Sequence, residues 1–294
     1  MAHGTTAPLD PAGLLAALTT SAASGSLPWN LRPEILGPLV LAGGLYTLGW
    51  RRLARREPGA AGGGRLALAL GALLAIAVAL LSPLDALAHR LFAAHMVQHM
   101  LLIAVAAPAL LLADPFPALI WALPAAGRRA AQRWLRRDTA AGGAWRALTP
   151  MPLAWACYML VLWLWHLPDA YDAALGDRLL HDLEHASFFA AAILFWWPVI
   201  HPAPRFRPRA SDAARVTYLV LAAFQTAALG LLLTLTPTAL YAFYADAPRP
   251  PGFDALDDQV WGGVVMWGLG GLIDMVAVLV LLHRAMGPSP VRPP

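Results

Sequence analysis

The chain contains no lysine, and all 21 of its basic residues are arginine. Only 13% of its 294 residues are charged, against roughly a quarter in a typical soluble domain. Hydrophobic residues make up 59% of the chain, and the mean hydropathy is +0.58. This shortage of charge excludes an ordinary soluble domain and predicts a membrane protein.

Cysteine is almost absent as well. Cys157 is the only one, and it lies in an apolar stretch, which excludes a disulfide framework within the chain and any Cys-x-x-Cys metal motif. The net charge of +4 would suggest nucleic acid in a soluble protein. Here membrane topology accounts for the arginines, so no nucleic-acid partner is expected.

Seven apolar stretches reach or approach the roughly 17 to 25 residues that a membrane-crossing helix needs. They cover residues 34–50, 66–81, 87–112, 151–166, 179–200, 213–236 and 260–283. The expected fold is therefore all-α, a polytopic membrane protein built as a seven-helix bundle. The bundle occupies residues 34–284, between an extracytoplasmic N-terminal segment at 1–33 and a cytoplasmic tail at 285–294.

The arginines are distributed unevenly between these stretches. Five follow the first stretch, six follow the third, four follow the fifth and two follow the seventh, which leaves four of the 21 on the other side. Cytoplasmic loops carry the excess of arginine in membrane proteins. The pattern predicts an N-terminus outside and a C-terminus inside the cytoplasmic membrane.

Two histidine pairs share one spacing, His95 with His99 and His181 with His185. Residues four apart lie on the same face of a helix, and both pairs fall near the predicted outer ends of their helices. His95 and His99 are expected roughly 10 to 18 Å below that end. His166 closes the outer end of another helix. Because imidazoles in hydrocarbon are costly without a partner, the pattern predicts a metal or haem site in the outer leaflet.

Further candidate residues lie on these helices and on the last predicted helix, where Met266 is expected about 12 Å in from Asp258, a depth similar to that of His95. A thioether together with imidazole suits copper, particularly Cu(I), better than magnesium or calcium. Carboxylate and amide oxygens can orient the imidazoles by accepting their N–H groups. The candidates are Met96, Met100 and Met266 as ligands, and Glu184, Asp258 and Gln259 as hydrogen-bond partners of the ligands.

The same histidines fit other functions. Facing histidines can hold haem iron axially or a di-iron centre, which would make the protein a redox protein or an enzyme. Copper or proton transport would need polar residues in the inner half of the bundle, where Asp274 is the strong candidate. No third histidine cluster of the di-iron type is present, so we favour a metal-binding protein without turnover.

Four segments resemble, in order, stretches of the CtaG-type cytochrome c oxidase assembly factors, which are seven-span bacterial membrane proteins. They are residues 82–102, 163–171, 181–200 and 257–271. The runs HMVQHM at 95–100 and DQVWGGVVMW at 258–267 are the most specific. The matching positions are His95, Met96, His99, Met100, His166, His181, His185, Asp258, Gln259 and Met266.

This resemblance implies a role in maturing a haem-copper oxidase, with copper supplied outside the bacterial plasma membrane. The implied cofactor is copper. The implied partners are an oxidase subunit and a copper-donor protein, with the lipid bilayer as the surroundings.

Overall fold

The computed structural model describes residues 11–13, 29–57, 62–136, 138–247, 249 and 253–286. Most of this part of the chain is helical and none of it is strand, which confirms the predicted all-α class. Most of the predicted N-terminal segment and of the tail at 285–294 lies outside the described residues.

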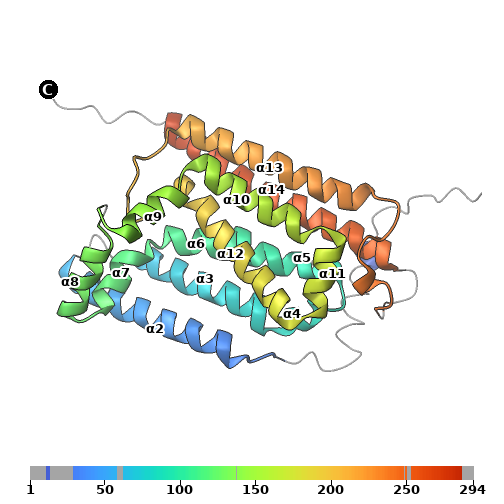
Figure 1. Cartoon of the computed structure of the whole chain (residues 1–294), viewed down its shortest axis with the longest axis horizontal. Helices are drawn as coiled ribbons and strands as arrows, with labels where there is room; N and C mark the ends of the chain where they lie inside the picture. The colour runs from blue at the N-terminus through green and yellow to red at the C-terminus, as the bar shows by residue number, and fades with distance from the viewer. Residues whose placement is uncertain are drawn as a thin grey trace, which may run out of the picture.

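The helices are packed side by side along the long axis of the molecule (Figure 1). The long ones are α2 (Pro33–Arg56), α3 (Gly63–Leu81), α10 (Met151–Trp165), α12 (Arg178–Ile200), α13 (Asp212–Leu235) and α14 (Ala255–Met286). Three consecutive elements together form one further long helical segment, from Phe92 to Leu112: α5 (Phe92–Met100), η2 (Leu101–Ala106) and α6 (Ala107–Leu112). The short elements are α4 (Pro83–Ala88), α7 (Pro115–Ala122), α8 (Ala125–Trp134), α9 (Ala140–Leu148), α11 (Pro168–Gly176) and η3 (Ala242–Tyr244).

Five helical paths in the described chain are long and apolar enough to cross a membrane. They are α3, the path from Phe92 to Leu112, α12, α13 and α14, with a sixth if α9 and α10, bent by 70° at their junction, form one span. The predicted multi-pass membrane protein is confirmed. The seventh span, which would be α2, and the orientation stay predictions.

The third predicted helix begins later than expected. It was expected from residue 87, but α5 begins at Phe92, because Leu91 has an extended backbone and residues 83–88 form the separate helix α4. Two caps produce the break. The Ser82 hydroxyl accepts from Leu84 N at 3.1 Å to begin α4, and the Asp258 carboxylate accepts from Phe92 N at 2.8 Å to begin α5.

The helix then widens directly after α5. Residues 101–106 form a π-helix, a rare form that often occurs at functional sites. Pro108 follows and lacks the N–H that would bond to the carbonyl of residue 104, so the regular ladder cannot continue through this turn. Trp196 of α12 donates to the carbonyl of Ile103 at 3.1 Å, which ties the wide turn to the neighbouring helix.

Glycines allow α14 to approach its neighbours closely. A Cβ at Gly262 would overlap the ring of Phe92 on α5, and one at Gly263 would overlap Thr234 and the carbonyl of Gly230 on α13. Small residues of this kind let membrane helices pack at short distance. The contact with Phe92 fixes where α5, and with it the first histidine pair, sits against α14.

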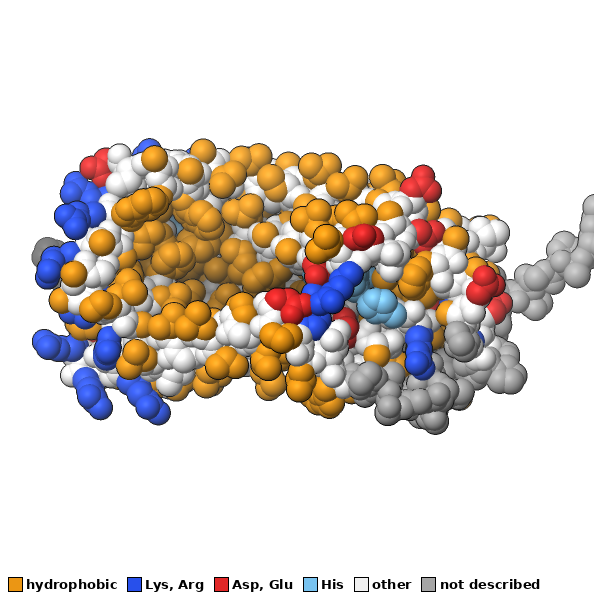
Figure 2. All heavy atoms as spheres, turned by 60° about the horizontal axis from the view of Figure 1, so that its bottom comes forward, with side chains coloured by type: hydrophobic (Ala, Val, Ile, Leu, Met, Phe, Trp, Pro, Cys, Tyr) orange, Lys and Arg blue, Asp and Glu red, His pale blue; other side chains and the backbone are white. Residues whose placement is uncertain are grey.

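The two ends of the molecule differ in charge. Helices α8 and α9 lie at one end, and α4 and α11 lie at the other (Figure 1). Basic side chains gather at one end of the surface and acidic side chains toward the other, with a hydrophobic surface between them (Figure 2). The arginines of α8 and of the last turn of α2 mark the first end, and we call it the arginine-rich end.

Candidate metal centre

Both histidine pairs occupy equivalent positions in their helices. His95 and His99 lie three and seven residues after Phe92, and His181 and His185 lie three and seven residues after Arg178. At ~1.5 Å per residue this is about 4.5 and 10.5 Å from each helix start. The first pair therefore lies closer to the start of its helix than the sequence predicted, because α5 begins at Phe92. Both pairs lie at the same distance from the starts of their helices.

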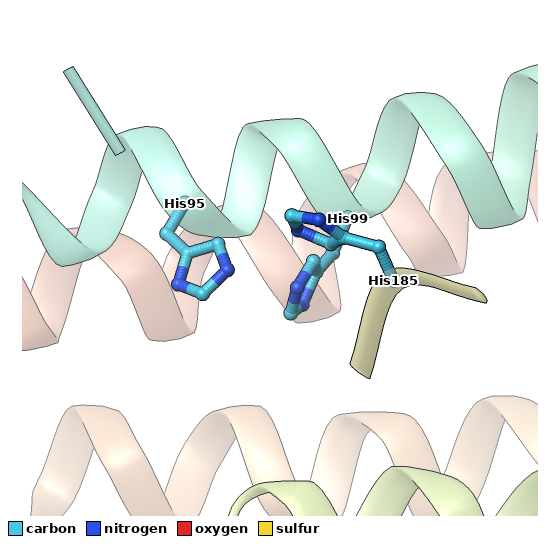
Figure 3. Close-up of side chains that lie close together, drawn as sticks. All are labelled: His95, His99 and His185. Atoms are coloured by element: carbon cyan, nitrogen blue, oxygen red, sulfur yellow. The ribbon is translucent and has the colours of Figure 1, made fainter. Parts of the chain in front are cut away.

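The four imidazoles, which we call the histidine cluster, are in mutual contact. Ring centroids are 4.3 Å apart within each pair, and His95 lies 5.2 Å from His181 and 5.6 Å from His185. His99 lies 5.2 Å from His185. Figure 3 shows His95 and His99 on one helix with the His185 ring beside them. The predicted meeting of these two pairs is present in the structure.

The nitrogen spacing fits one bound ion. Nε2 of His95 lies 3.3 Å from Nε2 of His181. Two nitrogens bound to one tetrahedral ion at 2.0–2.1 Å lie about 3.3–3.4 Å apart, so this pair already has the spacing of two ligands. Two groups of three, His95 with His99 and His185, and His95 with His181 and Glu184, each hold their ligand atoms within 4.8 Å.

Glu184 lies inside the cluster. Its side chain is fully buried, with one oxygen 3.6 Å from Nε2 of His99 and the other 4.0 Å from Nε2 of His95. The sequence placed Glu184 as a partner that orients a ligand. The structure places its carboxylate among the imidazoles, within reach of an ion that they would hold.

Several buried polar atoms of the cluster have no hydrogen-bond partner in the described chain. They are both ring nitrogens of His99, Nε2 of His185 and both carboxylate oxygens of Glu184. Buried polar groups are normally satisfied, and a group of unsatisfied ones needs an explanation such as an ion. A cation bound between them would satisfy the carboxylate and the imidazole lone pairs together.

Two tyrosines fix the orientation of His95. Nδ1 of His95 lies 2.5 Å from the Tyr171 hydroxyl, which lies 3.3 Å from the Tyr244 hydroxyl. Tyr244 donates to the carbonyl of Ala88 at 2.6 Å. If Tyr171 then donates to Tyr244 and Nδ1–H of His95 donates to Tyr171, every group is satisfied. Nε2 of His95 is left with its lone pair toward the cluster, as a metal ligand requires.

Both hydroxyls keep their protons. Burial raises the pKa of Tyr171 and of Tyr244 well above the usual value for a phenol. Tyr171 stands on α11 and Tyr244 on η3, and the Asp172 carboxylate joins these elements by accepting from Ala242 N at 3.0 Å and Phe243 N at 3.1 Å. Sequence reasoning did not find this pair of phenols.

Replacing Tyr171 by phenylalanine should weaken metal binding about 10- to 100-fold, because loss of a partner that orients a ligand typically costs this much. Metal affinity of the purified protein, measured by competition with a chelator, tests this. Tyr218→Phe is the matched control, since Tyr218 also donates to a carbonyl in the interior, that of Phe195, away from the cluster. Equal affinities for the two variants would contradict the role given to Tyr171.

His166 lies next to the cluster at the end of α10. Its Nδ1 donates to the Leu162 carbonyl at 2.7 Å, and its Nε2 has no partner in the described chain. Its ring contacts Phe188 and Tyr171, at centroid distances of 6.1 and 6.5 Å. It belongs to neither group of three ligands. It is therefore a neighbour of the cluster, and its role as a ligand stays a prediction.

Met96 and Met100 of α5 lie toward α14, the helix that carries Met266. A Cβ at Gly262 would stand 3.3 Å from Met96 Cγ, and one at Gly270 would stand 3.8 Å from the Met100 sulfur. Met266 is buried in the main hydrophobic cluster of the described chain. Met96 and Met100 thus contact α14. His95 and His99, on the same helix α5, contact the histidines of α12.

Asp258 and Gln259 hold backbone in place. Asp258 accepts from Phe92 N and Ala93 N, and Gln259 donates to the Leu233 carbonyl at 3.0 Å and accepts from Leu240 N at 2.7 Å. The prediction that they accept from imidazoles is not matched by these contacts. They position the start of α5 and the connection between α13 and α14, and so act on the cluster through the fold.

A family model described as cytochrome c oxidase caa3 assembly factor matches residues 44–287. This range includes the histidine cluster, Tyr171, Tyr244 and Asp258. No curated protein and no solved structure matches the chain.

Proposed function

Because the chain belongs to the cytochrome c oxidase caa3 assembly factor family, we propose that it binds a copper ion and supplies it to a haem-copper oxidase subunit. The proposed ligands are the four imidazoles of the histidine cluster and the carboxylate of Glu184. The observation that carries this proposal is the convergence of unsatisfied buried nitrogen and oxygen atoms at one point. The protein itself carries out no turnover in this account.

The donor atoms favour copper. Imidazole suits zinc, copper, iron and nickel, and among divalent ions a site of nitrogen and oxygen donors binds copper most tightly. The thioethers are left out of the proposed set because Met96 and Met100 contact α14. A set of nitrogens with one carboxylate fits Cu²⁺ better than the Cu(I) that the sequence suggested.

The proposed topology has seven spans, with α2 as the first and the bent path of α9 and α10 as the fourth. The N-terminus is then outside, and the arginine-rich end faces the cytoplasm. Support comes from the position of the cluster near the starts of α5 and α12, at the end of the molecule opposite α8 (Figure 1). Copper would be received from a donor protein, and delivered, on the periplasmic or outer side of a bacterial plasma membrane.

The alternative functions fit the geometry less well. The cluster rings are in contact at 4.3 to 5.6 Å, which leaves no gap for a haem macrocycle between them. Di-iron carboxylate proteins use several glutamates, whereas Glu184 is the one carboxylate in the two ligand groups of the described chain. Transport would need a path from the cluster toward Asp274. The cavity between Asp274 and Met100, about 20 Å³, holds at most about one water, and the larger pocket that Asp274 also lines is an apolar groove between α13 and α14.

Metal analysis of the purified protein tests the proposal. Wild type is expected to hold about one copper per chain and to show no haem absorption, since the cluster offers one set of ligands. His99→Ala and His185→Ala are each expected to hold clearly less copper, because each breaks one of the two groups of three ligands. His283→Ala, which removes an exposed histidine at the far end of α14, is the control and should keep it. Equal copper in all four proteins would contradict the assignment.

A further inference from the structure

An exposed histidine stands beside the buried cluster. His89 follows the last residue of α4, and its Nδ1 lies 2.9 Å from the carbonyl oxygen of Asp85. A carbonyl can only accept, so the proton is on Nδ1 and Nε2 carries a lone pair. An ion arriving from solvent can therefore bind to this nitrogen.

His89 is in contact with the cluster. Its ring centroid lies 5.0 Å from that of His181, with the two rings nearly perpendicular at 85°. His181 is 5% exposed, and its Nε2 lies 3.3 Å from Nε2 of His95, which is fully buried. His89, His181 and His95 thus form a row of imidazoles that leads from the surface to the centre of the cluster.

A buried polar network holds His89 in this place. The Asp85 carboxylate accepts from the Gln98 side chain and from the Asn30 side chain, each at 3.0 Å. Gln98 precedes His99 on α5 and also donates to the carbonyl of Ala79 at 2.7 Å. The turn that carries His89 is therefore fixed to the helix that carries the first histidine pair.

The other opening beside the cluster is less suitable for an ion. It is a groove between α2, α3, η2 and α12 that His185 lines, and most of its remaining lining is apolar, including Ile35, Leu39, Leu80 and Phe189. A hydrated cation entering there would have to cross apolar surface, which is costly. Its charged lining is Arg32 together with Glu34 and Asp182, and Arg32 already donates to these carboxylates, at 3.1 Å and 2.8 Å.

We propose that His89 is the receiving ligand, which captures Cu²⁺ from the aqueous side and passes it to His181 and then to His95. This inference rests on the proposed function. In the transfer, the bond from copper to Nε2 of His181 forms before the bond to Nε2 of His89 breaks. No electron moves, and a proton present on Nε2 of His181 leaves to water. His89 is therefore needed for rapid exchange and is not among the ligands of the final site.

Loading kinetics test the proposal. The metal-free protein in detergent is mixed with Cu²⁺ held by a weak coloured chelator, and the transfer is followed by stopped-flow absorbance. His89→Ala should load at least about tenfold more slowly than wild type, while its final copper content and affinity stay unchanged. His89→Asp, which restores a ligand atom, should recover part of the rate. His283→Ala, which also removes an exposed histidine, should load at the wild-type rate.

Two results would overturn the proposal. In one, His89→Ala loads as fast as wild type. In the other, His89→Ala loses copper at equilibrium although its thermal unfolding matches wild type, which would make His89 a ligand of the final site. Both differ from failure of the proposed function itself, in which wild type would bind no copper at all.

Discussion

His95→Ala is expected to lower the copper affinity of the protein by more than about 100-fold, beyond the range seen when only an orienting partner is removed. His95 is the one residue shared by both three-ligand groups. Its Nε2 faces His181 and its Nδ1 faces the Tyr171 hydroxyl, so the substitution removes a ligand and also leaves Tyr171 without this partner.

The comparison with His181→Ala makes this prediction specific. Without His181, the group of His95, His99 and His185 remains complete, so the loss of affinity should be smaller than for His95→Ala. Chelator competition on the purified proteins measures both affinities, and thermal unfolding of the metal-free proteins shows whether each variant is folded. A folded His95→Ala protein with unchanged affinity would contradict the central place given to His95.

Gly262→Ala is expected to destabilise the protein by about 1–3 kcal/mol, the usual cost of overpacking a tight contact. The added Cβ would overlap the ring of Phe92. That ring cannot move aside easily, because it is stacked on Tyr241 at 4.9 Å and contacts Tyr171 at 5.5 Å and Tyr244 at 6.0 Å. The start of α5 must shift instead, which weakens the Asp258 cap and displaces His95.

Gly268→Ala on the same helix is the matched control. A Cβ at Gly268 meets no atom within 4 Å, so this substitution should be neutral or stabilising by about 0.5–1 kcal/mol, the usual gain from replacing a helical glycine. Thermal unfolding in detergent measures the stability of both variants, and copper affinity should fall only in Gly262→Ala. If the two variants are equally stable, α5 and α14 have room for a methyl group at Gly262, which would contradict the close packing described here.

The histidine cluster could be predicted from the sequence because its spacing is a property of single helices. Residues four apart share a face in any α-helix, and both pairs lie near the start of a helix. Glu184 could have been placed by the same argument, since it lies three residues after His181 on the face of that pair. From the sequence, Glu184 was expected only to orient a ligand.

Contacts between distant segments could not be predicted in this way. Tyr171 and Tyr244 reach His95 from α11 and η3, which are short elements between long helices, and no periodicity marks them. The role of Asp258 depends on the free backbone N–H groups at the start of α5. That start was itself misplaced, because apolar composition alone did not reveal the turn at residues 89–91.

The number of membrane-spanning helices was also not fully predictable from the sequence. Every long helix was identified from its apolar composition, but composition does not decide whether α2 and α10 cross the membrane. Helix α2 carries Glu34 in its first turn and arginines in its last, and α10 has only 15 residues. A helix of this length spans about 22 Å, less than the ~30 Å hydrocarbon core. The bend between α9 and α10 depends on tertiary packing, which the sequence pattern does not contain.

X-ray absorption spectroscopy at the copper edge of the copper-loaded wild-type protein is the most direct test of the central claim. We expect scattering from several imidazole nitrogens and one carboxylate oxygen, without a sulfur ligand, and loss of this signal in His95→Ala. A spectrum dominated by thioether sulfur, or one in which His95→Ala keeps the wild-type signal, would contradict a copper site built on the histidine cluster and Glu184.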